Sequence, residues 1–113
     1  MKLTAESYGH AVILNISGEL TEDSLQAFRQ SVEHQLNGDR IVDLVLNMED
    51  VPFVDSAVLE YLVDLQAQML QKHGQVKLIK CDENMLKILE ITRLNTMFEV
   101  AGDVADVLKA SYV

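Results

Sequence analysis

The residues best placed to do chemistry are the dipeptide Asp55-Ser56. An apolar run from Asp43 to Asn47 with the composition of a β-strand precedes it, and a long segment with helical spacing of apolar residues follows it. The sequence therefore predicts a strand-to-helix turn that presents the Ser56 hydroxyl to solvent at a helix N-terminus. A phosphoryl group is tolerated there, because it lies near the positive end of the helix dipole. We interpret Ser56 as a regulatory phosphorylation site.

Helix capping is the simpler explanation of the same dipeptide. Asp and Ser are among the best N-cap residues, and each stabilises a helix by about 1 kcal/mol relative to alanine. From Asp55-Ser56 alone, capping is the favoured interpretation. The surrounding sequence has to decide between the two.

Other catalytic or metal-binding groups are scattered along the chain. The three histidines, His10, His34 and His73, fall in a turn, a helix and a helix end, without the spacing of a metal site. Cys81 is the single cysteine, which we expect to be a structural thiol. Ser56 lacks the G-x-S-x-G context of a nucleophilic serine and has no histidine placed to act as its base. We therefore expect no catalytic residues, no metal, no cofactor and no enzymatic activity.

Length and charge restrict the class of protein. The 113 residues, 49% of them hydrophobic, predict one domain spanning 1–113. The formal net charge of −9 argues against nucleic acid and anionic membranes as partners, and it is compatible with docking onto a basic protein surface. The N-terminus lacks the apolar run of a signal peptide, and no stretch approaches 18 uninterrupted apolar residues. We therefore expect a cytoplasmic protein without membrane insertion.

The N-terminal half predicts a hairpin followed by a helix and a strand. Leu3 to Ser7 and the β-branched run Ala11 to Ser17 flank a turn at Tyr8-Gly9-His10. A helix capped by Thr21 and ended by Asn37-Gly38 follows, with an apolar face of Leu25, Phe28, Val32 and Leu36. The next strand, Ile41 to Asn47, is almost continuously apolar, which is typical of a strand buried in a parallel sheet.

The C-terminal half continues this alternation. A helix from about Ser56 to His73 carries a buried stripe, with Gly74 as the left-handed residue that ends it; the stripe comprises Val58, Leu62, Leu65 and Met69, widened by Leu59 and Leu70. A strand from Gln75 to Lys80 and a helix opened by Asp82-Glu83-Asn84 come next. The apolar residues Leu94, Met97, Phe98 and Val100 predict a last strand, and a final short helix contains Val104, Val107 and Leu108.

The predicted order β-β-α-β-α-β-α-β-α describes an α/β domain. Its sheet is mostly parallel with an N-terminal hairpin, it carries about four helices, and its β-α-β crossovers are expected to be right-handed.

The sequence resembles the STAS family, the anti-sigma factor antagonists of bacterial partner switching. The family motif D-S-[ST]-G-L-G after a strand is matched by Val54-Asp55-Ser56-Ala57-Val58-Leu59-Glu60, following Val45-Leu46-Asn47. Ser17-Gly18-Glu19-Leu20 is similar to the family's G-E-L turn. The resemblance covers essentially the full length and implies a STAS-type domain with a right-handed β-α superhelix.

The resemblance also implies a function. Ser56 corresponds to the serine that a serine kinase, itself the anti-sigma factor, phosphorylates and that a PP2C-type phosphatase restores. The unphosphorylated chain would then bind and sequester the kinase, and phosphorylation would release it. The implied partner-binding residues are Asp55, Ser56, Ala57, Val58 and Glu60.

Departures from the motif bear on the partner. Ala57 replaces a second hydroxyl residue, so Ser56 is the only acceptor in the motif. Val58 and Glu60 replace two glycines, which implies a differently shaped partner surface. The alternative function keeps the fold without phosphorylation: a STAS scaffold, or a subunit of a lipid-transport ABC assembly, in which Ser56 only caps its helix and contacts a partner.

Overall fold

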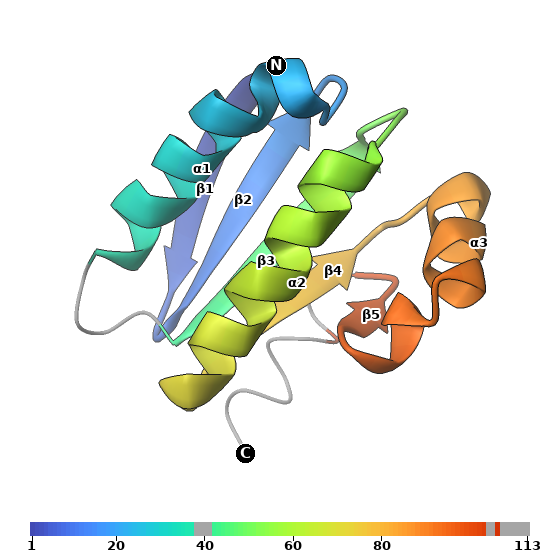
Figure 1. Cartoon of the computed structure of the whole chain (residues 1–113). Helices are drawn as coiled ribbons and strands as arrows, with labels where there is room; N and C mark the ends of the chain where they lie inside the picture. The colour runs from blue at the N-terminus through green and yellow to red at the C-terminus, as the bar shows by residue number, and fades with distance from the viewer. Residues whose placement is uncertain (38–41, 104–105, 107–113) are drawn as a thin grey trace.

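A computed structural model of the chain describes residues 1–37, 42–103 and 106. Five strands form one sheet, and the helices pack beside it (Figure 1). In chain order the elements are β1 (Lys2–Tyr8), β2 (Ala11–Ser17), α1 (Glu22–Leu36), β3 (Asp43–Asp50), α2 (Ser56–Gln71), β4 (Gln75–Ile79), α3 (Glu83–Ile91), the 3-10 helix η1 (Leu94–Thr96) and β5 (Glu99–Ala101).

The strand order is β1-β2-β3-β4-β5, so strands that follow one another in sequence are neighbours in space. β1 and β2 pair antiparallel, and every later pairing is parallel. This confirms the predicted single α/β domain with an N-terminal hairpin. The described residues form three α-helices and a 3-10 turn; the predicted fourth helix, with Val104, Val107 and Leu108, lies outside them.

The main core lies between the helices and one face of the sheet. α1 and α2 lie across that face, whereas α3 lies beyond the end of β4 and packs against η1 (Figure 1). Every second strand residue points into this core, as Val12, Leu44 and Leu78 do. Ile13, Val45 and Ile79 are buried on the opposite face. β3 is therefore apolar on both faces, which explains its nearly continuous hydrophobic run.

The buried stripe of α2 is confirmed with one correction. Val58, Leu62, Leu65 and Met69 are buried, and Leu59 packs against the core at its margin. Leu70 is 54% exposed, so the prediction that it widens the stripe is wrong. It follows Met69 directly, and one residue turns about 100° around a helix, which carries Leu70 out of the core.

The end of α2 differs from its prediction. His73 adopts the left-handed conformation, with φ of 63°. Gly74 does not have a positive φ. A Cβ on Gly74 would lie 1.9 Å from the carbonyl oxygen of Val42, just before β3. Gly74 is thus required for the close approach of two backbones, and the prediction that it is the left-handed residue is wrong.

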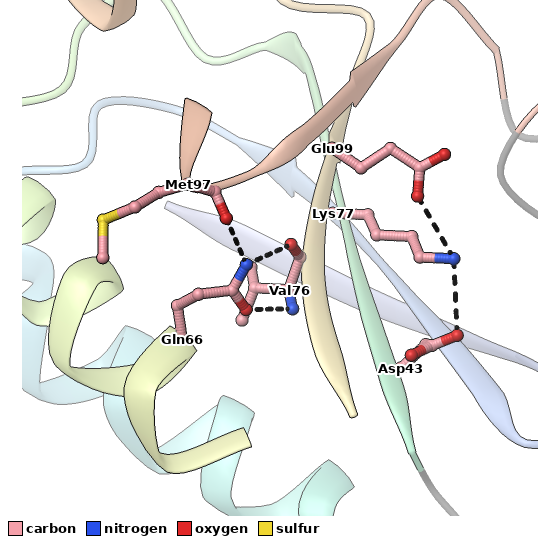
Figure 2. Close-up of polar contacts among 6 residues, drawn as sticks. All are labelled: Asp43, Gln66, Val76, Lys77, Met97 and Glu99. Carbon is pink, nitrogen blue, oxygen red and sulfur yellow. Dashed lines mark hydrogen bonds and ion pairs between the residues drawn. The ribbon is translucent and has the colours of Figure 1, made fainter. Parts of the chain in front are cut away.

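A buried polar side chain joins α2 to the end of the sheet (Figure 2). Gln66 Oε1 accepts the Val76 N–H at 2.6 Å, and Gln66 Nε2 donates to the carbonyl oxygens of Val76 at 3.2 Å and Met97 at 2.7 Å. The β4–β5 pairing begins only at Lys77. The Gln66 amide therefore pairs with the backbone N–H and C=O of Val76, as a neighbouring strand would.

A second polar group in Figure 2 lies on the other face of the sheet. Lys77, only 3% exposed, is 3.4 Å from a carboxylate oxygen of Asp43 and 3.4 Å from one of Glu99. These pairs link β3, β4 and β5 across the sheet. Two carboxylates beside one ammonium satisfy a charge whose burial alone would be unfavourable.

Candidate functional site

The Asp55 carboxylate joins the N-termini of two helices. Its Oδ1 accepts the Val58 N–H of α2 at 3.1 Å, and its Oδ2 accepts the Glu22 N–H of α1 at 2.7 Å. The first bond is an N-cap, because it satisfies a backbone donor that has no partner within its own helix. The second bond does the same for α1, 33 residues away in the sequence. Both helices therefore begin at one carboxylate.

Backbone hydrogen bonds hold the two loops that lead into these helices. Leu20 N–H donates to Phe53 O at 2.9 Å, and Asp55 N–H donates to Leu20 O at 3.0 Å. Gly18 N–H reaches Asp50 O at 3.0 Å, and its φ of 115° favours glycine. The Gly18-Glu19-Leu20 turn thus lies against the Asp55 loop, where the parallel strands β2 and β3 end.

Ser56 is the first residue of α2 and is exposed. Its hydroxyl makes no hydrogen bond to any residue that the structure describes, whereas Asp55 carries the side-chain cap. The predicted alternatives are thereby divided between the two residues: Asp55 caps the helix, and Ser56 presents a hydroxyl to solvent. The exposed Glu60 lies one turn further along α2, on the same side as Ser56.

The remaining two predicted partner-binding residues differ in exposure. Ala57 is half-buried beside Ser56. Val58 is 0% exposed and belongs to the core. Its side chain therefore neither reaches nor obstructs a partner in this structure, which corrects the expectation that this branched side chain shapes the docked surface. The valine fills the α2 side of the core, where a glycine would leave it open.

An apolar groove beside this turn was missed from the sequence. It has a volume of about 300 Å³ and lies between the residues preceding Asp55 and helix α3, with Phe53, Ile88 and Ile91 among its lining residues. Phe53 is 51% exposed and Ile91 is 73% exposed. The only available signal was Pro52-Phe53, an apolar aromatic residue in a loop between a strand and a helix.

Comparison with known proteins decides the family. The model of the STAS domain matches residues 2–107. The chain belongs to the STAS domain family. This confirms the resemblance carried by the Asp55-Ser56 motif and the Gly18-Glu19-Leu20 turn.

Solved structures share the fold of this STAS domain. The Thermotoga maritima protein TM1081 matches with a TM-score of 0.88 and 20% identity, over 96% of this chain and 92% of that one. The Bacillus anti-sigma factor antagonist SpoIIAA matches in its unphosphorylated form with a TM-score of 0.81 and 14% identity, over 99% and 98% of the two chains. The murine anion transporter Slc26a9 matches with a TM-score of 0.80 and 20% identity, over 96% of this chain and 19% of the transporter.

The single cysteine of this STAS domain is a protected thiol. Burial, and to a smaller extent the neighbouring Asp82 carboxylate, raises the pKa of Cys81 from its ordinary value of 9.0 to about 11. Residues 1–37, 42–103 and 106 contain no group of three or more histidine, cysteine or acidic residues that could hold a metal ion. Within the same residues, no helix is long and apolar enough to cross a bilayer.

Proposed function

We propose that this STAS domain is a partner-switching regulator of the anti-sigma factor antagonist type. Its unphosphorylated form binds and sequesters a serine kinase of the anti-sigma type, and phosphorylation of Ser56 releases that partner. One observation carries the proposal: the exposed Ser56 hydroxyl has no hydrogen-bond partner among the described residues, while the adjacent Asp55 supplies the side-chain cap of α2. The hydroxyl is therefore free for a kinase.

The Asp55 carboxylate makes the proposed switch an electrostatic one. A phosphoryl group adds about −1.5 to −2 charges at pH 7. Asp55 is held by two backbone N–H groups and cannot swing away, and Glu60 lies one turn along the helix. A docked partner would have to cover this concentrated negative charge. Like charges placed across an interface cost several kcal/mol, and each 1.4 kcal/mol lowers the affinity ten-fold.

The proposed partner surface is centred on the start of α2. It comprises Ser56, Ala57 and Glu60 with Asp55 behind them, and the exposed Phe53 extends it toward the apolar groove. An exposed aromatic residue beside a charged motif is typical of an interface anchor. The acidic character of the chain favours a partner whose docking surface is basic.

The comparison with SpoIIAA supports this proposal. SpoIIAA is known in a phosphorylated form and in an unphosphorylated form, and the phosphorylated form matches this chain with a TM-score of 0.73 and 15% identity. By analogy, a PP2C-type phosphatase would return the chain to its binding form. We propose that the cycle takes place in the cytoplasm, where such a kinase would have ATP.

Mass spectrometry of the chain from its native cell tests the modification. We expect a species heavier by about 80 Da, the mass of one phosphoryl group, with the added mass mapped to Ser56. The Ser56→Ala variant should lack this species. The Ser7→Ala variant is the matched control, because Ser7 is also exposed but lies in the N-terminal hairpin, and it should keep the modification. Phosphate found only at other residues would contradict the proposal.

A binding comparison tests the switch. A serine kinase of the anti-sigma type from the same cell should bind wild type and Ser56→Ala with similar affinity, and Ser56→Asp at least about ten-fold more weakly. Ser7→Ala should bind as wild type does. Equal affinities for all four proteins would leave the non-phosphorylated scaffold as the better function. The fold of Slc26a9 supports that alternative, because there the same fold forms part of a transporter.

A further inference from the structure

β1 is an outer edge of the sheet. It pairs with β2 on one side, and no described strand pairs with its other side. Six of its seven residues are exposed, and Leu3 is half-buried. An edge of this kind presents unpaired backbone N–H and C=O groups, and another chain can bind there as a further strand.

The hairpin register identifies the backbone groups that face outward. Gly9 and His10 form a two-residue turn closed by the pair Tyr8 and Ala11, with Gly9 at φ of 60°. Hydrogen-bonded pairs alternate along an antiparallel ladder, so the groups that face β2 belong to Tyr8 and every second residue before it. The outward-facing groups therefore belong to the residues between them, including Leu3 and Ala5.

The sequence of β1 is complementary to itself in one antiparallel register. When two copies pair with Thr4 opposite Thr4, Leu3 lies opposite Ala5 of the second copy, and the outward-facing groups of these residues meet. The same register places Lys2 opposite Glu6 of the second copy, twice by symmetry. Opposite charges directly across a strand pair are stabilising. We propose that β1 is a homodimerisation edge that joins two copies into a continuous ten-stranded sheet about Thr4.

The surface beside β1 lacks the acidic residues that would keep two copies apart. A hollow of about 360 Å³ lies between β1 and α1, lined by Leu3, Thr4, Ala5, Leu14, Ala27, Gln30, Ser31, His34 and Gln35. None of these residues is acidic, although 18 of the 113 residues of the chain are Asp or Glu. Each chain has a net charge of −9, so two copies repel each other least when these neutral surfaces face each other.

The small size of this edge makes the dimer weak. One strand pair with its flanking side chains buries less than the 1,200–2,000 Å² or so of a stable interface. We expect a dissociation constant on the order of 100 µM, so that the protein is a monomer when dilute and a dimer when concentrated.

Sedimentation velocity of the full chain from about 10 µM to 1 mM covers this range. Lys2→Glu and Glu6→Lys should each weaken the dimer roughly ten-fold, because each replaces two attractive pairs with two like-charge pairs. The double variant Lys2→Glu/Glu6→Lys should restore the affinity of wild type. The two single variants shift the net charge in opposite directions, so an effect of overall charge alone would make Glu6→Lys dimerise more tightly.

A backbone variant tests the same edge independently. Ala5→Pro removes an outward-facing N–H, and proline is tolerated at that kind of position on an edge strand. It should be monomeric with the circular dichroism spectrum of wild type. If it does not fold, the charge variants alone decide.

Three outcomes would overturn the proposal. The first is a wild-type monomer at about 1 mM, which would leave the edge to a segment of another protein. The second is tighter association of Glu6→Lys than of wild type. The third is a double variant that remains as weak as the single variants.

Discussion

At the scale of single residues, Asp55 and Ser56 divide two tasks that the sequence could not separate. Both residue types cap helices well, and either would explain the dipeptide. In the structure the carboxylate of Asp55 accepts one N–H from each of two helices, while Ser56 is exposed. A substitution at Asp55 should therefore affect stability, and one at Ser56 should affect regulation.

Asp55→Ala should lower the free energy of unfolding by about 2 kcal/mol, because it removes two hydrogen bonds to a charged acceptor. Asp55→Asn should cost about half as much, since its amide has only one acceptor oxygen. Ser56→Ala is the neighbouring control and should change stability by less than about 0.5 kcal/mol. Urea unfolding followed by circular dichroism measures all three. Equal losses for Asp55→Ala and Ser56→Ala would show that Asp55 is not the joint of the two helices.

Cys81 should be unreactive in the folded protein. With its pKa raised from 9.0 to about 11, the folded chain holds about 100-fold less thiolate at pH 8 than the unfolded chain does. A disulfide reagent should accordingly label Cys81 much more slowly in buffer than in urea. The unfolded thiol ionises first as the pH rises, so this group lowers stability between about pH 9 and pH 11. Cys81→Ser should lack that loss, and a rapidly labelled folded thiol would contradict the assignment.

At the scale of elements, the end of α2 is determined by what lies beside it. The sequence predicted Gly74 as a left-handed glycine, whereas His73 takes that conformation and Gly74 lies against Val42 O. A glycine that terminates a helix and a glycine that admits another backbone look the same in a sequence. The distinction requires the position of β3.

Gly74→Ala should destabilise the protein by about 2 kcal/mol or more, because the added Cβ would overlap the Val42 carbonyl oxygen and backbone would have to move. His73→Gly should be neutral or stabilising by up to about 1 kcal/mol, since glycine adopts positive φ without strain. Thermal unfolding of the two variants compares these effects. The reverse order of stabilities would restore Gly74 as the left-handed residue.

Gln66 shows a further limit at this scale. It lies four residues after Leu62 and would be placed with the apolar stripe by spacing alone, yet it is polar and 1% exposed. Its amide is hydrogen-bonded to Val76 in β4 and to Met97, which lies between η1 and β5. Helical spacing alone identifies neither the burial of Gln66 nor its hydrogen-bond partners, because both depend on tertiary structure.

At the scale of the whole molecule, the proposed switch changes binding without changing the fold. A phosphate on Ser56 lies at the N-terminus of α2, where the helix dipole offers about 0.3–1 kcal/mol, and the nearby Asp55 carboxylate opposes it. Phosphorylated and unphosphorylated protein should therefore unfold within about 1 kcal/mol of each other and share one far-ultraviolet circular dichroism spectrum. Thermal melts of the two purified forms test this. A phosphorylated form that melts far below the other would favour release by unfolding.

The sequence by itself determined the order of the first four strands and the three α-helices, the parallel core strands, the capping residue types and the family motif, because these depend on local periodicity and composition. Only the tertiary structure decided that Asp55 binds both helices, that Val58 is core, that Gly74 faces Val42 and that Phe53 borders a groove. Each of these contacts is made between residues that are distant in the sequence, so local patterns do not reveal it. At the turn where the sequence predicts the functional site, Asp55 binds the N-termini of α1 and α2, and the Ser56 hydroxyl remains exposed.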